Sequence, residues 1–275
     1  MRPIITFLSD FGLADEWVGV CKGVIKRIAP HAEIIDISHE VPNFNVKKGA
    51  LLLASAASFM PKGIHLAIVD PGVGTERRAI IILTKRGDYL VGPDNGLLIP
   101  AAQSLGGIKK VVEITNERYM HKPICPSFHG RDIFAPVAAH LAVGEDMDEF
   151  GPEINVNDLV QIPWSKARIS GEEIICEVID VDKFGTLRLN VTLHELMKCG
   201  IRLKNQILVK WDGEDVILPL LRTFGEVKAG ELLLLVDSSD HLCIAVNQGS
   251  AAVRLGLKVG SKITLIKSIT PKVSN

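Results

Sequence analysis

The sequence has few aromatic residues, no long hydrophobic run and almost no net charge. Phe, Trp and Tyr make up 5% of its 275 residues, too few for the stacking platforms of single-strand binders. The 31 basic and 32 acidic residues leave a formal net charge of −1, which excludes the positive field of a general nucleic-acid binder. The N-terminus has the pattern of a first strand, not of a signal peptide. We therefore expect a cytoplasmic protein that binds neither nucleic acid nor membrane.

Cysteine is also scarce, and its spacing excludes two classes of protein. The five cysteines are widely separated and form no CxxC pair. This pattern argues against a disulfide framework and against a thiolate zinc site. We expect these thiols to be small apolar groups in a reducing compartment.

Short apolar runs alternate with amphipathic segments in the first half of the chain. Strands are predicted at residues 4–8, 34–37, 64–69, 79–84 and 89–92, and helices at 18–28, 47–59, 100–105 and 133–142. This alternation predicts an α/β domain with a central, mostly parallel sheet covered on both faces. Ligands of such sheets bind beyond the carboxyl ends of the strands.

The second half of the chain has the texture of an all-β domain. Its predicted elements are strands at 174–181, 186–191, 206–211, 215–220, 232–236, 242–246 and 262–266, with one helix at 193–198. We expect a smaller barrel-like domain at residues 168–275, following the α/β domain at 1–155. Proline and asparagine mark the segment 156–167 as the linker.

Two of the predicted strands end in polar loops that could carry chemistry. Asp10 follows the first strand beside a glycine turn, a position suited to accepting hydrogen bonds from ribose hydroxyls. Asp15 is either a helix N-cap or a ligand contact. In the loop 69–78, Asp70 and Arg77 could position and polarise a small nucleophile, or could form a structural ion pair.

Two further polar segments follow along the chain. Residues 94–96, Asp-Asn-Gly, are typical of a structural turn. His129 lies in a loop and not on an apolar helical face, which makes its imidazole a candidate functional group. Asp132 is either a helix N-cap or a functional carboxylate.

The same acidic and imidazole groups raise the alternative of a metal site. They show no recognised metal-ligand spacing, and Arg77 and Arg131 nearby would repel a cation. We therefore expect no metal. The candidate metal ligands that this expectation excludes are Asp10, Asp70, Asp94, His129 and Asp132.

Taken in order, these segments resemble a known family. The motifs are SDFG at 9–12, DISHEV at 36–41, VDPGVGTERR at 69–78, GPDNGLL at 92–98 and FHGRD at 128–132, with weaker matches at 182–186 and 244–252. Together they resemble the S-adenosyl-L-methionine hydrolase (hydroxide adenosyltransferase) family, which is related to the adenosyl-fluoride and adenosyl-chloride synthases. The resemblance implies a homotrimer with its site at the subunit interface, a small-molecule substrate and no cofactor.

The activity that this resemblance implies is the hydrolysis of S-adenosyl-L-methionine to adenosine and L-methionine. The family's Asp–Arg–His trio matches Asp70, Arg77 and His129. A water held in line with the C5′–S bond would attack the ribose C5′. The halide-using relatives replace the Asp and the His, which disfavours a halide synthase here. Which of the three groups activates the water stays open.

The resemblance also implies which residues bind the substrate. In the N-terminal domain, Asp10 would hold the ribose hydroxyls, Phe44 would pack near the ribose or adenine, and Asp15 would bind the ammonium group. Asn95 and Gly130 complete this part of the predicted set. In the C-terminal domain the implied contacts are the ammonium with Asp182, the adenine with Phe224, Asn247 and Gln248, and the carboxylate with Ser238 or Ser239.

Three other functions remain as alternatives. An adenosyl-halide synthase would use chloride in place of water. A non-catalytic protein that binds or senses S-adenosyl-L-methionine would not need the trio. A metal-dependent hydrolase would be inhibited by a chelator.

Overall fold

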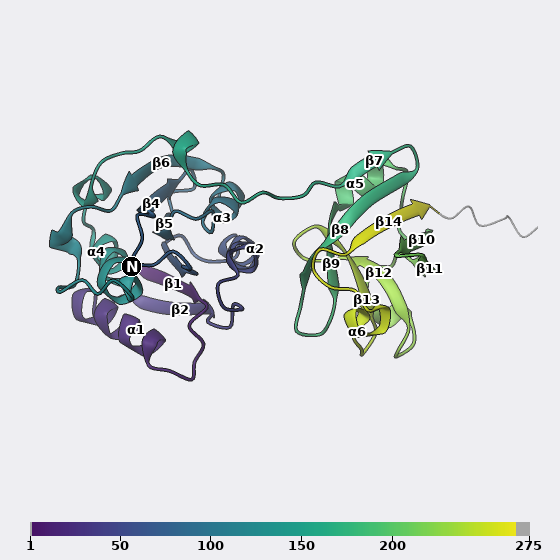
Figure 1. Cartoon of the computed structure of the whole chain (residues 1–275), viewed down its shortest axis with the longest axis horizontal. Helices are drawn as coiled ribbons and strands as arrows, with labels where there is room; N and C mark the ends of the chain where they lie inside the picture. Colours follow the sequence, from purple (N-terminus) through teal and green to yellow (C-terminus); the bar gives the residue numbers. More distant parts are fainter. Residues whose placement is uncertain (1, 268–275) are drawn as a thin grey trace, which may run out of the picture. The chain divides into compact units, whose positions relative to one another are not determined.

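The chain divides between Ile162 and Pro163 into two units, each with its own hydrophobic core (Figure 1). The computed structural model describes residues 2–267. The division falls inside the segment 156–167. Within residues 2–267, no helix has both the length and the apolar character that crossing a membrane requires.

A six-stranded sheet forms the centre of the first unit. Its strands are β1 (Ile4–Ser9), β2 (Glu33–Ser38), β3 (Ile64–Ile68), β4 (Ala79–Thr84), β5 (Tyr89–Pro93) and β6 (Ile108–Glu113). They lie in the order β2-β1-β3-β5-β4-β6. β1 pairs parallel with β2 and β3, and β3 pairs parallel with β5. β4 runs antiparallel to both β5 and β6.

The sheet is mostly parallel, as expected, but it is mixed, because β4 runs opposite to the other five strands. Four residues, 85–88, join β4 to β5, and a connection this short can only return the chain antiparallel. β6 was not predicted, because two lysines at positions 109 and 110 interrupt its apolar pattern. The division into an α/β domain and a β domain is confirmed.

Helices cover both faces of this sheet. They are α1 (Trp17–Ile28), α2 (Val46–Ala57), α3 (Ile99–Ser104) and α4 (Ala135–Val143). α1 and α4 share one core and α2 and α3 the other. Successive side chains of β1 point to opposite faces of the sheet and pack in the two cores alternately. Phe7 belongs to the core with α1 and α4, and Leu8 to the core with α2 and α3. Three 3₁₀ turns and a π-helical turn complete the unit: η1 (Glu117–Tyr119), η3 (Met147–Phe150), η4 (Val156–Asp158) and η2 (Gly130–Phe134).

The second unit is a nearly closed antiparallel barrel. Its strands are β7 (Arg168–Ser170), β8 (Glu173–Val181), β9 (Leu187–Thr192), β10 (Gln206–Trp211), β11 (Glu214–Pro219), β12 (Leu232–Val236), β13 (His241–Val246) and β14 (Lys262–Lys267). They run in the order β11-β10-β14-β8-β9-β13-β12, with β7 on β8. Leu221 N donates to Leu234 O over 2.8 Å, which brings the chain after β11 against β12. All seven predicted strands are confirmed.

Short helical segments interrupt the barrel strands. α5 (Leu193–Lys198) begins with a capping box, in which the Thr192 hydroxyl accepts from Glu195 N and the Glu195 carboxylate accepts from Thr192 N. α6 (Ala251–Leu255) and the 3₁₀ turn η5 (Phe224–Glu226) also form, so the expectation of a single helix in this half was wrong. With five and three residues, both are too short for a helical period to be visible in the sequence.

Candidate active site

Asp70, Arg77 and His129 meet at the carboxyl edge of the first unit's sheet. Arg77 Nε lies 3.0 Å from each Asp70 carboxylate oxygen, and Arg77 Nη2 lies 2.5 Å from Asp70 Oδ2. The same Nη2 lies 2.9 Å from His129 Nδ1. The guanidinium also stacks 5.0 Å from the ring centroid of Phe134, a contact that the sequence analysis did not identify. Arg77 therefore bridges the carboxylate and the imidazole.

The chemistry of arginine determines the state of the imidazole. A guanidinium has donors and no acceptor, so His129 Nδ1 must accept, and the neutral ring carries its proton on Nε2. Burial lowers the pKa of His129 below its usual value, and the positive charge of Arg77 lowers it further. The trio thus holds a neutral imidazole with one N–H free to donate.

Asp10 lies in the loop that follows β1. Its Oδ2 accepts from Phe44 N over 2.8 Å, so the two residues that the resemblance assigns to the nucleoside are neighbours. Phe44 has a left-handed backbone, with φ of 64°, and an exposed ring. Burial raises the pKa of the Asp10 carboxyl, the Phe44 amide opposes this, and the Asp70 carboxylate raises the pKa further. Asp10 and Asp70 thus share one electrostatic environment.

Gly130 allows the His129 loop to approach the Asp10 loop. A Cβ added at Gly130 would lie 3.0 Å from Phe11 Cζ and 3.4 Å from Ile68 Cδ1. Phe11 in turn packs edge-on against Phe128, with ring centroids 6.0 Å apart. Gly130 is buried, so its contribution here is close packing of backbone against an aromatic ring.

Neither Asp132 nor Asp15 is the helix N-cap that the sequence allowed. The buried Asp132 accepts from Cys125 N over 2.8 Å and pairs with Arg131, and it is not a helix N-cap. Asp15 is exposed and is not an N-cap either, because α1 begins after Glu16.

Asn95 and Asp94 hold the backbone around the trio. Asn95 Nδ2 donates to Val69 O over 2.8 Å, directly before Asp70, and Asn95 Oδ1 accepts from Leu97 N. Both polar atoms of this side chain therefore bond to the backbone.

Asp94 pairs with Arg78 and also accepts from Val160 N over 3.0 Å. Arg78 Nη2 in addition donates to Asp158 O. The segment that leaves the first unit is thereby tied to the residue that follows Arg77.

The predicted contacts of the second unit lie partly around one hollow. Asp182, Phe224 and Ser238 line a cavity of about 400 Å³ beside β9, β12 and β13. Asp182 Oδ1 accepts from Phe184 N and Thr186 N, which orders its turn. Asp180, Arg188, Arg222 and Asp237 give the same hollow a strongly charged lining that the sequence analysis missed.

Asp237 organises the loop of the two predicted serines. Arg188 Nε donates to Asp237 Oδ2 over 2.6 Å, and Ser239 N donates to Asp237 Oδ1 over 2.8 Å.

Neither Asn247 nor Gln248 is among the residues that line this hollow. Asn247 Nδ2 donates to Val227 O, and Gln248 has a left-handed backbone with φ of 57°.

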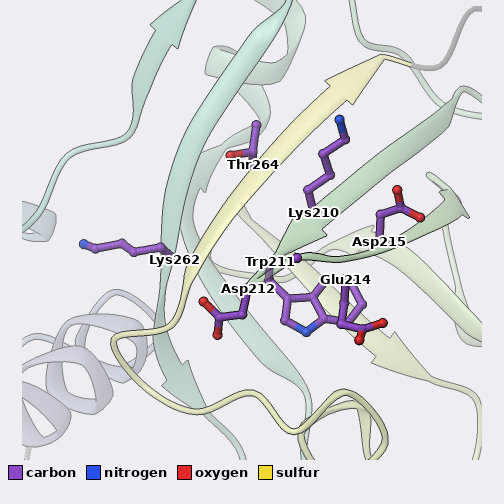
Figure 2. Close-up of a pocket in the computed structure, with 8 residues that line it drawn as sticks. Lys210, Trp211, Asp212, Glu214, Asp215, Lys262 and Thr264 are labelled. Carbon is purple, nitrogen blue, oxygen red and sulfur yellow. The ribbon is translucent and has the colours of Figure 1, made fainter.

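A second hollow of about 400 Å³ lies at the β10–β11 hairpin (Figure 2). It contains none of the predicted site residues, and its lining mixes both signs of charge around Trp211. The lining residues are Lys210, Trp211, Asp212, Gly213, Glu214, Asp215, Lys262 and Thr264.

The described residues 2–267 contain many acidic and imidazole side chains but no metal-binding cluster of them. No group of three or more His, Cys, Asp or Glu side chains there has an arrangement that could hold a metal ion.

The geometry defines a two-unit protein with a partly buried Asp–Arg–His trio at the carboxyl edge of its α/β sheet. Residues 5–151 match the family model described as the SAM hydroxide adenosyltransferase N-terminal domain, and residues 176–264 match the C-terminal domain of the same family. The chain belongs to the SAM hydroxide adenosyltransferase family.

Individual relatives agree with this membership. The chain is 43% identical to the (R)-S-adenosyl-L-methionine hydrolase of Salinispora tropica, over 95% of this chain and 97% of the relative. It is 28% identical to a fluorinase of an Actinoplanes species, over 97% of this chain and 98% of the relative. A crystal structure of an uncharacterized conserved protein from Thermotoga maritima superposes with a TM-score of 0.91 at 40% identity, covering 96% of this chain and all of the other.

Proposed function

We propose that this protein hydrolyses S-adenosyl-L-methionine to adenosine and L-methionine. The observation that carries the proposal is the bridge that Arg77 makes between Asp70 and His129, within a chain that is 43% identical to a named hydrolase of this substrate. A water oxygen attacks the ribose C5′ as the C5′–S bond breaks, and the bonding pair leaves with sulfur to give neutral methionine thioether. One water proton is released, so atoms and charge balance.

Within the trio, Asp70 is the group suited to receive that proton. His129 Nδ1 already accepts from Arg77, and Nε2 carries a proton, so the ring can donate to the water but not accept from it. Asp70 Oδ2 accepts from both Nε and Nη2 of Arg77, whereas Oδ1 accepts only from Nε among these contacts and keeps a second lone pair for the water proton. Arg77 would stabilise the hydroxide character that develops on the water. The sulfonium is already a good leaving group and needs no acid.

The substrate contacts proposed in the first unit are Asp10 with the ribose hydroxyls and Phe44 with the nucleoside, supported by their 2.8 Å contact. Asp15 would bind the ammonium group, with Asn95 and Gly130 shaping the surrounding loops. In the second unit the charged hollow supports Asp182 and the serine loop as partners of the amino-acid group. Phe224, Asn247 and Gln248 are proposed for adenine. No metal or cofactor is proposed.

We further propose a cytoplasmic homotrimer in which the second unit of one subunit completes the site on the first unit of its neighbour. The proposal follows from the family resemblance. It is supported by the presence of a separate set of candidate substrate contacts on each unit.

The origin of the new C–O bond provides the test. Purified protein incubated with S-adenosyl-L-methionine in ¹⁸O-labelled water, with a chelator present, should form adenosine and methionine in equal amounts, with the label in the adenosine 5′-hydroxyl. Mass spectrometry reads the position of the label. Absence of adenosine above the uncatalysed rate would falsify the hydrolase and favour a binding protein. Appearance of 5′-chloro-5′-deoxyadenosine on adding chloride would instead indicate a halide synthase.

Activity should fall in acid as His129 becomes protonated. Its pKa is held below the usual value of about 6.5, so the ring is neutral at pH 7 and gains a proton only in more acidic solution. A protonated Nδ1 would face the Arg77 N–H donor and lose their hydrogen bond. We expect kcat/KM to be flat between about pH 7 and 9 and to decrease only at a pH below the usual histidine pKa of about 6.5.

The matched variant for this pH profile is His129→Asn, whose amide oxygen can accept from Arg77 and does not titrate. The decrease in kcat/KM at acidic pH, the acid limb of the profile, should disappear in this variant. An unchanged limb would assign the titration to another group, such as Asp10.

A further inference from the structure

A series of polar contacts leads from α1 to the loop that carries Asp10. Lys22 Nζ donates to Asp36 Oδ2 over 2.6 Å, and Asp36 Oδ1 lies 3.1 Å from His39 Nε2. His39 Nδ1 lies 2.7 Å from Ser9 Oγ. Ser9 is fully buried and His39 is 4% exposed, so water cannot replace either group in this contact. The series ends one residue before Asp10.

His39 also holds the loop through its backbone. Gly12 N donates to His39 O over 2.8 Å, and Phe11 N lies 3.4 Å from Ser9 Oγ. The edge of the Phe7 ring packs against the imidazole, with centroids 4.7 Å apart. These contacts lie on both sides of Asp10 along the chain, so they determine where its carboxylate is presented.

The order Asp36, His39, Ser9 is the order of a nucleophilic triad, but Ser9 cannot act as a nucleophile. Its hydroxyl has no exposed surface and is already shared between the imidazole and the Phe11 amide. Burial lowers the pKa of His39, and this outweighs the neighbouring Asp36 carboxylate. A neutral imidazole that accepts from Ser9 at Nδ1 carries its proton on Nε2, which lies 3.1 Å from Asp36 Oδ1.

We propose that His39 is a positioning residue for ribose binding, which fixes the loop 9–12 and the carboxylate of Asp10 through Ser9 Oγ and the Gly12 amide. The proposal rests on the proposed function for the identity of the ligand, but the order of the loop can be measured without it. His39 acts through Ser9 and Asp10, and touches neither the trio nor the substrate.

The same unit contains a natural control. Thr6 Oγ1 lies 2.8 Å from His65 Nδ1, and His65 Nε2 lies 3.4 Å from Asp88 Oδ1. These three residues are also buried, and Thr6 belongs to β1, as Ser9 does. His65 and Asp88 lie at the amino ends of β3 and β5, at the opposite edge of the sheet from Asp10. Loss of the Thr6 hydroxyl should therefore destabilise the protein about as much as loss of the Ser9 hydroxyl. It should leave the loop 9–12 unchanged, because Thr6 and His65 do not contact that loop through these bonds.

The experiment compares Ser9→Ala with Thr6→Val, and His39→Leu with His39→Asn, in the full chain. The Asn amide occupies the position of Nδ1 and can still bond to Ser9. We measure kcat and KM for S-adenosyl-L-methionine, the Kd for adenosine, and hydrogen exchange of the Phe11 and Gly12 amides. Ser9→Ala and His39→Leu should raise KM and the adenosine Kd, lower kcat/KM about 10- to 100-fold and speed exchange at both amides. His39→Asn should recover most of the loss, and Thr6→Val should change KM less than about twofold.

Two results would overturn the positioning role. One is that Ser9→Ala and His39→Leu lower only the melting temperature, as Thr6→Val does, with KM and exchange at 9–12 unchanged. The other is that His39→Asn behaves like His39→Leu. If His39→Leu does not fold, the Ser9→Ala and Thr6→Val pair decides the question. A wild-type protein without hydrolase activity would refute the proposed function alone, since the exchange measurement needs no turnover.

Discussion

Replacing Asp70 by Asn should lower kcat for S-adenosyl-L-methionine hydrolysis by about a thousandfold. The amide keeps the shape of the carboxylate and one acceptor for Arg77, but it cannot take a proton from the attacking water. The affinity for the substrate should change by no more than about threefold, because uniform binding does not depend on the proton acceptor. Calorimetric titration measures the affinity, and chromatography of adenosine measures the turnover.

Glu76→Gln is the matched control for this variant. Glu76 lies in the same loop, one residue before Arg77, and is exposed. Its loss of charge should leave kcat within about twofold, because an exposed surface charge contributes little. If Asp70→Asn kept more than a tenth of the wild-type kcat, the proton acceptor would be another group. If binding fell in parallel with turnover, Asp70 would be a substrate contact instead.

Replacing Asp88 by Ala should destabilise the protein by about 3 kcal/mol. This carboxylate is fully buried and accepts from Arg86 Nε over 2.6 Å and from Gly63 N over 3.1 Å, with His65 Nε2 3.4 Å away. Its removal leaves a buried imidazole and a buried amide without their partner. Equilibrium unfolding in urea measures the loss, and Asp148→Ala is the control. Asp148 pairs with Lys110 while 61% exposed, so its loss should cost less than about 1 kcal/mol.

The pH dependence of stability has a definite sign at Asp88. Burial alone would raise the pKa of this carboxyl, but the hydrogen bonds from His65, Arg86 and Gly63 lower it well below the usual value. Its stabilisation is therefore complete above the unfolded-state pKa of about 3.9 and is lost as the pH falls toward the folded-state pKa. The stability difference between wild type and Asp88→Ala should shrink in that acidic range. A constant difference would contradict the assignment.

Strand ends marked Asp70, Arg77 and His129 as separate candidates in the sequence, and the family resemblance grouped them as a trio. Asp70 follows a buried strand, and His129 lies in a loop ahead of a helix, so a doubly covered sheet brings both to one edge. The direction of β4 was also accessible, because only four residues separate it from β5. β6 was not, because Lys109 and Lys110 interrupt its apolar pattern, and the partners of Lys110, Asp148 and Glu153, are distant in the chain.

The roles of the remaining carboxylates could not be read from sequence. Asp94 and Asp132 had the same local appearance as Asp70, and only the fold shows that their acceptors are used by Val160 N and Cys125 N. The contact of Ser9 with His39 spans 30 residues and two strands. Local patterns report which residues share an edge of a sheet, but they do not report which hydrogen-bonding groups are already satisfied.

Arg77 and Arg78 are adjacent in the chain and serve different neighbours. Arg77 holds Asp70 and His129, while Arg78 bonds to Asp94 and to the carbonyl of Asp158, and Leu159 is buried in the core beneath α2 and α3. The first unit therefore has a structural end at Ile162, eleven residues beyond the end of the family-model match at 151. A first unit produced separately and cut at 151 would lack Asp158 and Val160, which bond to Arg78 and Asp94. Because Arg78 directly follows Arg77 in the chain, the loss of these bonds would also loosen the loop that holds the trio.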